Sequence, residues 1–251
     1  MQPSMDYKSL YPWEPPNLLT ETSSFTFHEK IVTLRKSKCH FDKEDDWIFL
    51  DPCVVDDLIC CDEAISPNKP FCYFYVTVFK RVLLRLPLSV FEKELLTELN
   101  VAPTQLHPNS WAFVRAFSIL CDQLSILPSV DMLLYLFEVK KLGRQLWVSV
   151  NSISGRGILT LFQSSYKTFK GHFLKVRANK KHPDLLDGFS LYWTEKPNFK
   201  VARRLHKLAP ADQEVCKFFT SLPVTFDTAY LLANEFDPDS LKSYTNTLFS
   251  L

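Results

Sequence analysis

Four acidic residues in one short stretch are the first candidates for chemistry in this sequence: Asp56, Asp57, Asp62 and Glu63. A nuclease or an integrase needs carboxylates that hold two metal ions about 4 Å apart. Such enzymes bring their acids together from separated strands, whereas these four belong to one segment. We therefore interpret the cluster as a solvated face and not as a catalytic centre.

The cysteines and histidines concentrate between residues 28 and 72, as His28, Cys39, His40, Cys53, Cys60, Cys61 and Cys72. A zinc site needs four convergent ligands, normally supplied by closely spaced pairs, and this set contains no C-x2-C pair. Adjacent residues such as Cys60 and Cys61 point in different directions in a strand or a helix. Because cysteine is also a frequent core residue, we expect neither a metal nor another cofactor.

Other signatures of catalysis are also missing from the sequence. There is no Walker sequence, no G-x-G-x-x-G and no G-x-S-x-G. His107 stands between Leu106 and Pro108, where it is expected to fix a turn by hydrogen bonding, and Cys121 is expected to be inert inside a core helix. We therefore expect no enzymatic activity and no small-molecule substrate.

The charged residues separate along the chain, although the formal net charge is only +1. Residues 41–66 contain nine acids against Lys43, and residues 165–207 contain eleven Lys and Arg against three acids. Basic side chains interleaved with Tyr166, Phe169 and Phe173 favour sequence-independent binding of RNA or single-stranded DNA. A second basic run, from Lys200 to Lys207, extends this region. The candidate binding residues are Lys167, Lys170, Lys175, Arg177, Lys180, Lys181, Arg203 and Arg204.

The alternative is that the two charged regions neutralise each other across an internal interface while the rings pack inward. The chain would then be a protein–protein interaction module that uses its acidic face and does not bind nucleic acid. Self-association is a further expectation. An odd number of cysteines, seven, and the absence of a signal peptide or a membrane-spanning apolar run predict a cytoplasmic or nuclear protein without a membrane partner.

The spacing of apolar and capping residues predicts the helices that must position these side chains. Ser89 and Glu92 have capping-box spacing, and the apolar positions that follow repeat with helical period at Phe91, Leu95, Leu96 and Leu99. Pro108-Asn109 opens a second helix, whose apolar stripe (Phe113, Phe117, Leu120, Leu124) is opposite Arg115, Ser118 and Asp122. Ser129 caps a third, apolar helix over about 130–137, which should be buried and, lacking Lys or Arg, should not read bases.

Strand signals follow at 146–150 and 158–162, joined by a turn at 151–157, and again at 172–177 and 189–194. The pattern predicts a short helix within 53–63 and C-terminal helices near 215–222 and from Asp237-Pro238. Residues 24–34 and 71–79 fit either a helix or a strand. We predict an α+β fold in which a helical layer (about 87–137) packs on a small antiparallel sheet (about 145–195). A proline-rich arm, 1–22, precedes a single domain, 23–251.

One long motif, Val101-Ala-Pro-Thr-Gln-Leu-His-Pro-Asn-Ser-Trp-Ala-Phe113, resembles the hallmark of a plant family labelled "putative gypsy-type transposase" or "putative plant transposon protein". Further matching segments are 61–63, 71–75, 85–91, 120–123, 137–140 and 164–170, so the resemblance covers roughly 60–220. It implies a gag-like retrotransposon protein that assembles or packages nucleic acid and has no established catalytic residues. It also implies a structural role for Pro103, Gln105, Leu106, His107, Pro108, Asn109 and Trp111. The gag-type zinc knuckle is absent.

Overall fold

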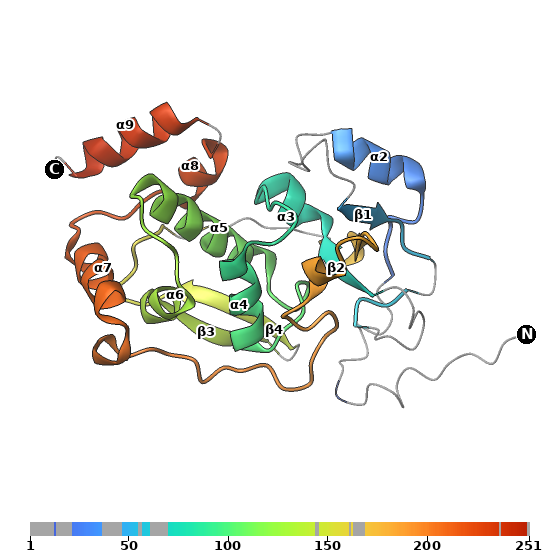
Figure 1. Cartoon of the computed structure of the whole chain (residues 1–251), viewed down its shortest axis with the longest axis horizontal. Helices are drawn as coiled ribbons and strands as arrows, with labels where there is room; N and C mark the ends of the chain where they lie inside the picture. The colour runs from blue at the N-terminus through green and yellow to red at the C-terminus, as the bar shows by residue number, and fades with distance from the viewer. Residues whose placement is uncertain are drawn as a thin grey trace, which may run out of the picture.

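The computed structural model describes residues 13, 22–36, 47–54, 57–60, 70–143, 146–160, 162, 169–235 and 237–249, which form the predicted α+β fold (Figure 1). The predicted arm, 1–22, lies almost entirely outside the described residues. The helices are α2 (His28–Lys36), α3 (Val76–Arg81), α4 (Val90–Leu99), α5 (Pro108–Gln123), α6 (Val130–Leu136), α7 (Pro210–Ser221), α8 (Thr228–Ala233) and α9 (Pro238–Phe249). The strands are β1 (Ile48–Asp51), β2 (Phe71–Tyr75), β3 (Phe137–Leu142), β4 (Trp147–Ser152) and β5 (Phe173–Ala178).

Local capping determines where several helices begin, as the sequence predicts. The Ser89 hydroxyl accepts a hydrogen bond from the Glu92 N–H at 3.3 Å, and the Glu92 carboxylate accepts from the Ser89 N–H at 2.8 Å. The Ser129 hydroxyl accepts from the Met132 N–H at 3.1 Å at the start of α6. These side chains satisfy amide groups that have no partner within the helix, so the three predicted helices between 87 and 137 are confirmed.

The sheets differ from the prediction in how the strands pair. β1, β5 and β2 form one antiparallel sheet in that order, and β3 and β4 form a separate two-stranded sheet. β4 therefore pairs with the strand before it, through a turn at Gly143 with φ of +64°, and not with 158–162. In the predicted returning strand, the described residues 158–160 and 162 form no strand, and Leu159 makes an isolated bridge to Phe226. Phe137 begins β3 directly after the helix ends at Leu136, and the strand runs from the buried Phe137 to exposed positions at its far end.

Two ambiguous segments are resolved, and two other predictions are wrong in the described residues. Residues 71–81 form a strand and then a helix, and α2 settles residues 24–34 as mainly helical. The described parts of 53–63 contain no helix, because Asp57 accepts from the Val54 N–H at 2.7 Å and closes a turn. Residues 189–194 form no strand, because the side chain of Gln105 bonds the backbone of Thr194 in place of a neighbouring strand.

α5 is the central element of the fold (Figure 1). Helices α8 and α9 pack against it, and β4 also contacts it. Two of the three residues of its predicted polar side are consequently buried, since Arg115 and Ser118 are each only 8% exposed, whereas Asp122 near the end of the helix is exposed. The sequence pattern was wrong on this point because it could not show that the C-terminal helices cover that side.

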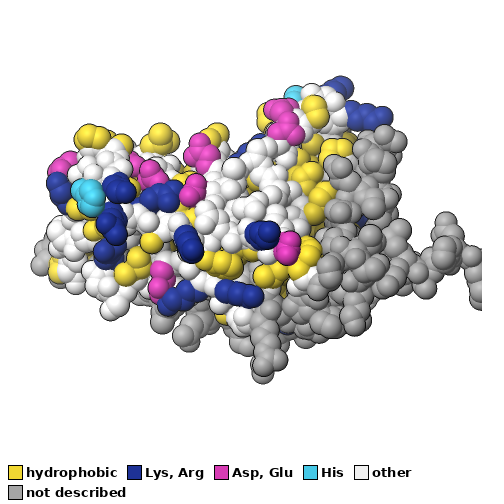
Figure 2. Space-filling view, turned by 90° about the horizontal axis from the view of Figure 1, so that it is seen from below, with side chains coloured by type: hydrophobic (Ala, Val, Ile, Leu, Met, Phe, Trp, Pro, Cys, Tyr) yellow, Lys and Arg dark blue, Asp and Glu magenta, His cyan; other side chains and the backbone are white. Residues whose placement is uncertain are grey.

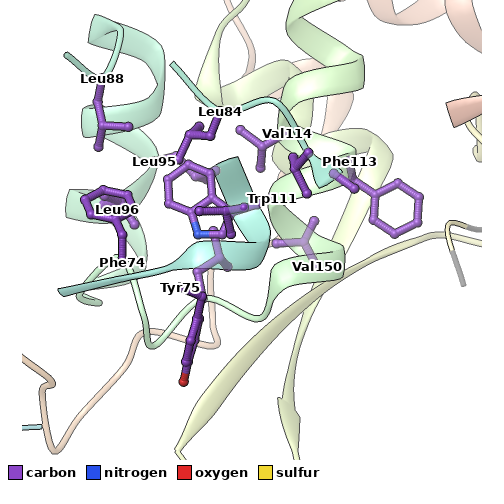
Figure 3. Close-up of a cluster of buried hydrophobic side chains, with 14 of the residues drawn as sticks. Phe74, Tyr75, Leu84, Leu88, Leu95, Leu96, Trp111, Phe113, Val114 and Val150 are labelled. Atoms are coloured by element: carbon purple, nitrogen blue, oxygen red, sulfur yellow. The ribbon is translucent and has the colours of Figure 1, made fainter. Parts of the chain in front are cut away.

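The core around α5 is built on Trp111, which lies among Leu84, Leu95 and Phe74 (Figure 3). The indole is fully buried, and its N–H donates to the Pro103 carbonyl at 3.0 Å. Burial of such a large ring contributes strongly to stability, and the hydrogen bond satisfies its polar group. Trp111 thereby fixes the turn before α5 against the helix itself.

Candidate nucleic-acid interface

The turn of the family motif is closed by a hydrogen bond from its own residues. His107 caps α5, with its Nδ1 accepting from the Asn109 N–H at 3.2 Å, and Pro108 occupies the first helical position. Burial and the nearby charge of Lys170 lower the pKa of His107 to about 4. The expectation that His107 fixes a turn is thus confirmed, and its imidazole is neutral at pH 7.

The same motif holds the segment that carries the second basic run. The Gln105 side chain donates to the Thr194 carbonyl at 2.8 Å and accepts from the Thr194 N–H at 3.0 Å. Further along, the Asn198 N–H donates to the Leu99 carbonyl at the end of α4, at 2.7 Å. These contacts position the extended chain before α7, which therefore has a defined path although it contains no strand.

Two of the predicted binding residues are neutralised by the acidic region. Lys175 Nζ lies 2.6 Å from Asp57 Oδ2, and Arg177 Nε lies 2.8 Å from Asp51 Oδ2. Arg177 also covers the Phe49 ring, at 4.9 Å from its centroid. At these positions the acidic and basic regions meet across an internal interface, as the alternative interpretation of the charge pattern requires.

Arg203 is also held by carboxylates. Its Nε lies 2.6 Å from Asp131 Oδ1, and its Nη2 lies 2.8 Å from Glu98 Oε1. The three side chains line an open groove of about 580 Å³ between α4, the start of α6 and the chain near Gly188. Val90, which is 72% exposed, lies at this groove.

The aromatic residues of the basic region pack inward. Phe173 is fully buried, and the Phe169 ring contacts Tyr75 at 4.8 Å and His107 at 5.3 Å between centroids. Lys170 lies over the Trp147 ring at 4.5 Å, an arrangement that stabilises the ammonium through the ring face. Tyr166 and Lys167 lie outside the described residues. The described rings are therefore not arranged to stack on bases.

Six exposed basic residues remain along the chain between β5 and α7, and we call them the basic strip: Lys180, Lys181, Lys196, Lys200, Arg204 and Lys207. None of them forms an ion pair with another described residue. Lys180 and Lys181 directly follow β5 beside β1, whereas the later part of this chain, which leads to α7, runs along the lower edge of the molecule in Figure 1. Figure 2 shows the lower face, where Lys and Arg side chains spread along the surface and gather at one end beside a histidine. Lys196 was not singled out from the sequence, because a lone lysine next to Glu195 gives no pattern.

The described cysteines are buried in the structure. Burial raises the pKa of the thiols of Cys53, Cys121 and Cys216 to about 12, so they stay protonated at neutral pH. Within the described ranges, no three His, Cys, Asp or Glu side chains gather as a metal site would require. Likewise, no helix in that part of the chain is both long enough and apolar enough to cross a membrane.

Residues 73–141 match the model of a protein family described as "Putative gypsy type transposon". The matched segment runs from β2 to β3 and includes the motif turn and α5. This match confirms the resemblance seen in the sequence motifs, and it relates the chain to a gypsy-type transposon protein family. No curated protein and no solved structure matches the chain.

Proposed function

We propose that this chain is a non-enzymatic, gag-like protein derived from a plant retrotransposon, which binds single-stranded nucleic acid through the basic strip. The observation that carries the proposal is the exposure of six cations that lack acidic partners among the described residues, on a chain segment held in place by the motif turn. Such side chains neutralise phosphates and release condensed counterions on binding. Because the neighbouring described rings pack inward, binding should depend on the phosphate backbone and show little sequence preference.

Several local environments support the non-enzymatic part of the proposal. The Nδ1 atom of His107 is engaged with a backbone amide, and burial keeps Cys121 and Cys216 as thiols. A catalytic cysteine requires the opposite shift, towards the thiolate. These groups therefore contribute to packing and capping, and the proposed activity is binding alone.

The experiment is a fluorescence-anisotropy titration of a mixed-sequence single-stranded RNA over a series of salt concentrations. The test variant reverses four charges of the basic strip, with Lys196, Lys200, Arg204 and Lys207 each changed to Glu. The control variant reverses four lysines elsewhere, at Lys140, Lys141, Lys217 and Lys242, which are also exposed. Both variants change the net charge equally, so a difference between them reports the location of the charges.

We expect the wild type and the control to bind with a steep salt dependence. For the basic-strip variant, the slope of log K against log salt should fall in magnitude by about 3, because each phosphate contact on a single strand contributes about 0.7. Lys175 and Arg177 are left unchanged, since reversing them would break the ion pairs with Asp57 and Asp51 and disturb folding. Equal binding by both variants would refute the basic strip as the interface.

A second candidate function is protein–protein interaction without nucleic acid, and the groove beside α4 favours it. Val90 is largely exposed there although it is apolar, and the groove is about 580 Å³ in volume. If the wild type fails to bind RNA even at low salt, this groove becomes the better candidate. Changing Val90 to Asp would then be expected to abolish binding of a protein partner while leaving the fold intact, since this side chain is on the surface.

A further inference from the structure

A second group of basic side chains surrounds a hollow of about 460 Å³ between α2, α3 and the start of β5. Its lining includes Phe25, Lys30, Lys80 and His172, with Glu29 as the acidic member. In Figure 1, α2 and α3 lie along the upper side of the molecule, away from the chain leading to α7 that carries Lys196, Lys200, Arg204 and Lys207. The hollow is therefore a separate feature, and the proposed nucleic-acid interface does not use it.

The floor of the hollow is the ring of Phe25, which is 7% exposed. Its position is fixed, because its N–H donates to the Ser23 hydroxyl at 3.0 Å and its carbonyl accepts from the Cys53 N–H at 2.9 Å. The ring of His172 meets it edge-on, with centroids 6.1 Å apart. The floor residue Phe25 is thus buried and hydrogen-bonded through its backbone.

Two ammonium groups converge on this floor. Lys30 Nζ lies 5.7 Å and Lys80 Nζ lies 6.0 Å from the centroid of the Phe25 ring. Lys30 also donates to the Ser24 carbonyl at 2.6 Å, which holds its head group near the hollow. Neither lysine has a carboxylate of the described residues within ion-pair distance. Both ammonium groups thus lie near the same ring, and no described carboxylate pairs with either of them.

The nine-residue helix α2 adds to the positive potential, since its N-terminal end carries a partial positive charge beside Lys30. Glu29 offsets part of this potential from the first turn of α2. The two positive charges of Lys30 and Lys80 outnumber the one negative charge of Glu29, so the net charge of these three side chains is positive. The chemistry that complements such a hollow is an anion with several acceptor oxygens.

We propose that this hollow binds a phosphate-bearing small molecule. The Lys30 and Lys80 ammonium groups pair with phosphate oxygens, because lysine binds phosphate as a point charge and charge-assisted hydrogen bonds are the stronger kind. The cavity of about 460 Å³ is larger than a phosphate group needs, so it leaves room for an organic part. The proposal does not depend on nucleic-acid binding at the basic strip.

The test is isothermal titration calorimetry with pyrophosphate at constant ionic strength, together with amide NMR shifts to locate the binding. Lys30→Ala and Lys80→Ala should each weaken binding about tenfold, the loss expected for one charge-assisted hydrogen bond. Glu29→Gln should strengthen binding of pyrophosphate, because it removes the negative charge from the hollow and keeps a side chain of the same size. The paired control, Lys140→Ala with Lys141→Ala, should bind as the wild type does.

Each outcome decides for or against the site. Amide NMR shifts at Phe25 and His172 on addition of pyrophosphate would support the site. Retained pyrophosphate binding by the four-site variant of the basic strip would separate this site from the nucleic-acid interface. The proposal is overturned if millimolar pyrophosphate does not bind, if the Lys30→Ala/Lys80→Ala double variant binds as tightly as the wild type, or if Glu29→Gln weakens binding. All three side chains are exposed, so thermal melting should show that the variants are folded.

Discussion

The buried ion cluster at Arg115 provides a sharp test of how this fold is held together. Arg115 Nη1 lies 3.4 Å from Glu92 Oε1, and its Nη2 contacts the Glu235 carboxylate. Arg85 contacts the same Glu235 oxygen at 2.9 Å. The Arg115 side chain is 9% exposed, whereas that of Arg85 is 46% exposed. One buried arginine, Arg115, and one exposed arginine, Arg85, thus share the Glu235 carboxylate.

We expect Arg115→Ala to lower the free energy of unfolding by about 3–5 kcal/mol, because it leaves the buried Glu92 carboxylate without a counter-charge and leaves Glu235 with the exposed Arg85 alone. Arg85→Ala should cost about 1 kcal/mol or less, because solvent screens an exposed pair. The loss at Arg115 also removes a contact that joins α4, α5 and the chain after α8. Since most domains are stable by about 5–15 kcal/mol, the difference between the variants is easily measured.

The assay is urea unfolding, followed by circular dichroism, of both variants, of Glu92→Gln, which keeps the capping-box spacing, and of the Arg115→Ala/Glu92→Gln double variant. The double variant should recover part of the loss, with a coupling of about 0.5–3 kcal/mol, because Glu92→Gln removes the buried charge that Arg115→Ala leaves unpaired. Equal stability of Arg115→Ala and Arg85→Ala would refute the reasoning. It would show that burial does not decide the strength of these contacts.

Three further outcomes follow from the structure. Ser89→Ala should cost about 1 kcal/mol in urea unfolding by removing the α4 cap, and an unchanged midpoint would argue against the capping box. Burial raises the pKa values of Cys121 and Cys216 to about 12. We therefore expect both thiols to react with a maleimide at pH 8 only after unfolding, as peptide mass spectrometry can show. Labelling of the native protein would contradict their burial. The pKa of His107 is lower in the folded state than its ordinary value of about 6.5. The unfolded chain therefore binds the proton first as pH falls, and the wild type should lose about 2 kcal/mol between pH 7.5 and 5. His107→Asn, which keeps a capping acceptor, should lack this loss, and an identical pH dependence would exclude His107 as its source.

Helix positions could be predicted because their signals are local. The capping box at Ser89, the cap at Ser129 and the start of α9 at Asp237 each depend on side chains within three residues of the amide that they satisfy. The family motif is similarly local, since His107 bonds Asn109 and Trp111 bonds Pro103. Sequence spacing alone defines such contacts, so the helical layer was placed correctly.

Strand partners and the environment of charged residues were decided by the tertiary structure. Arg177 and Asp51 are separated by 126 residues, and no local pattern shows that they meet on adjacent strands. Arg115 and Ser118 of α5 are buried because α8 and α9 pack against this helix. The described residues of 158–162 form an isolated bridge with Phe226 in place of a strand. The sequence by itself determined the helices, the family motif and the total of basic residues. Only the tertiary structure decided which cations are paired with acids and which remain exposed, because long-range packing fixes which side chains meet.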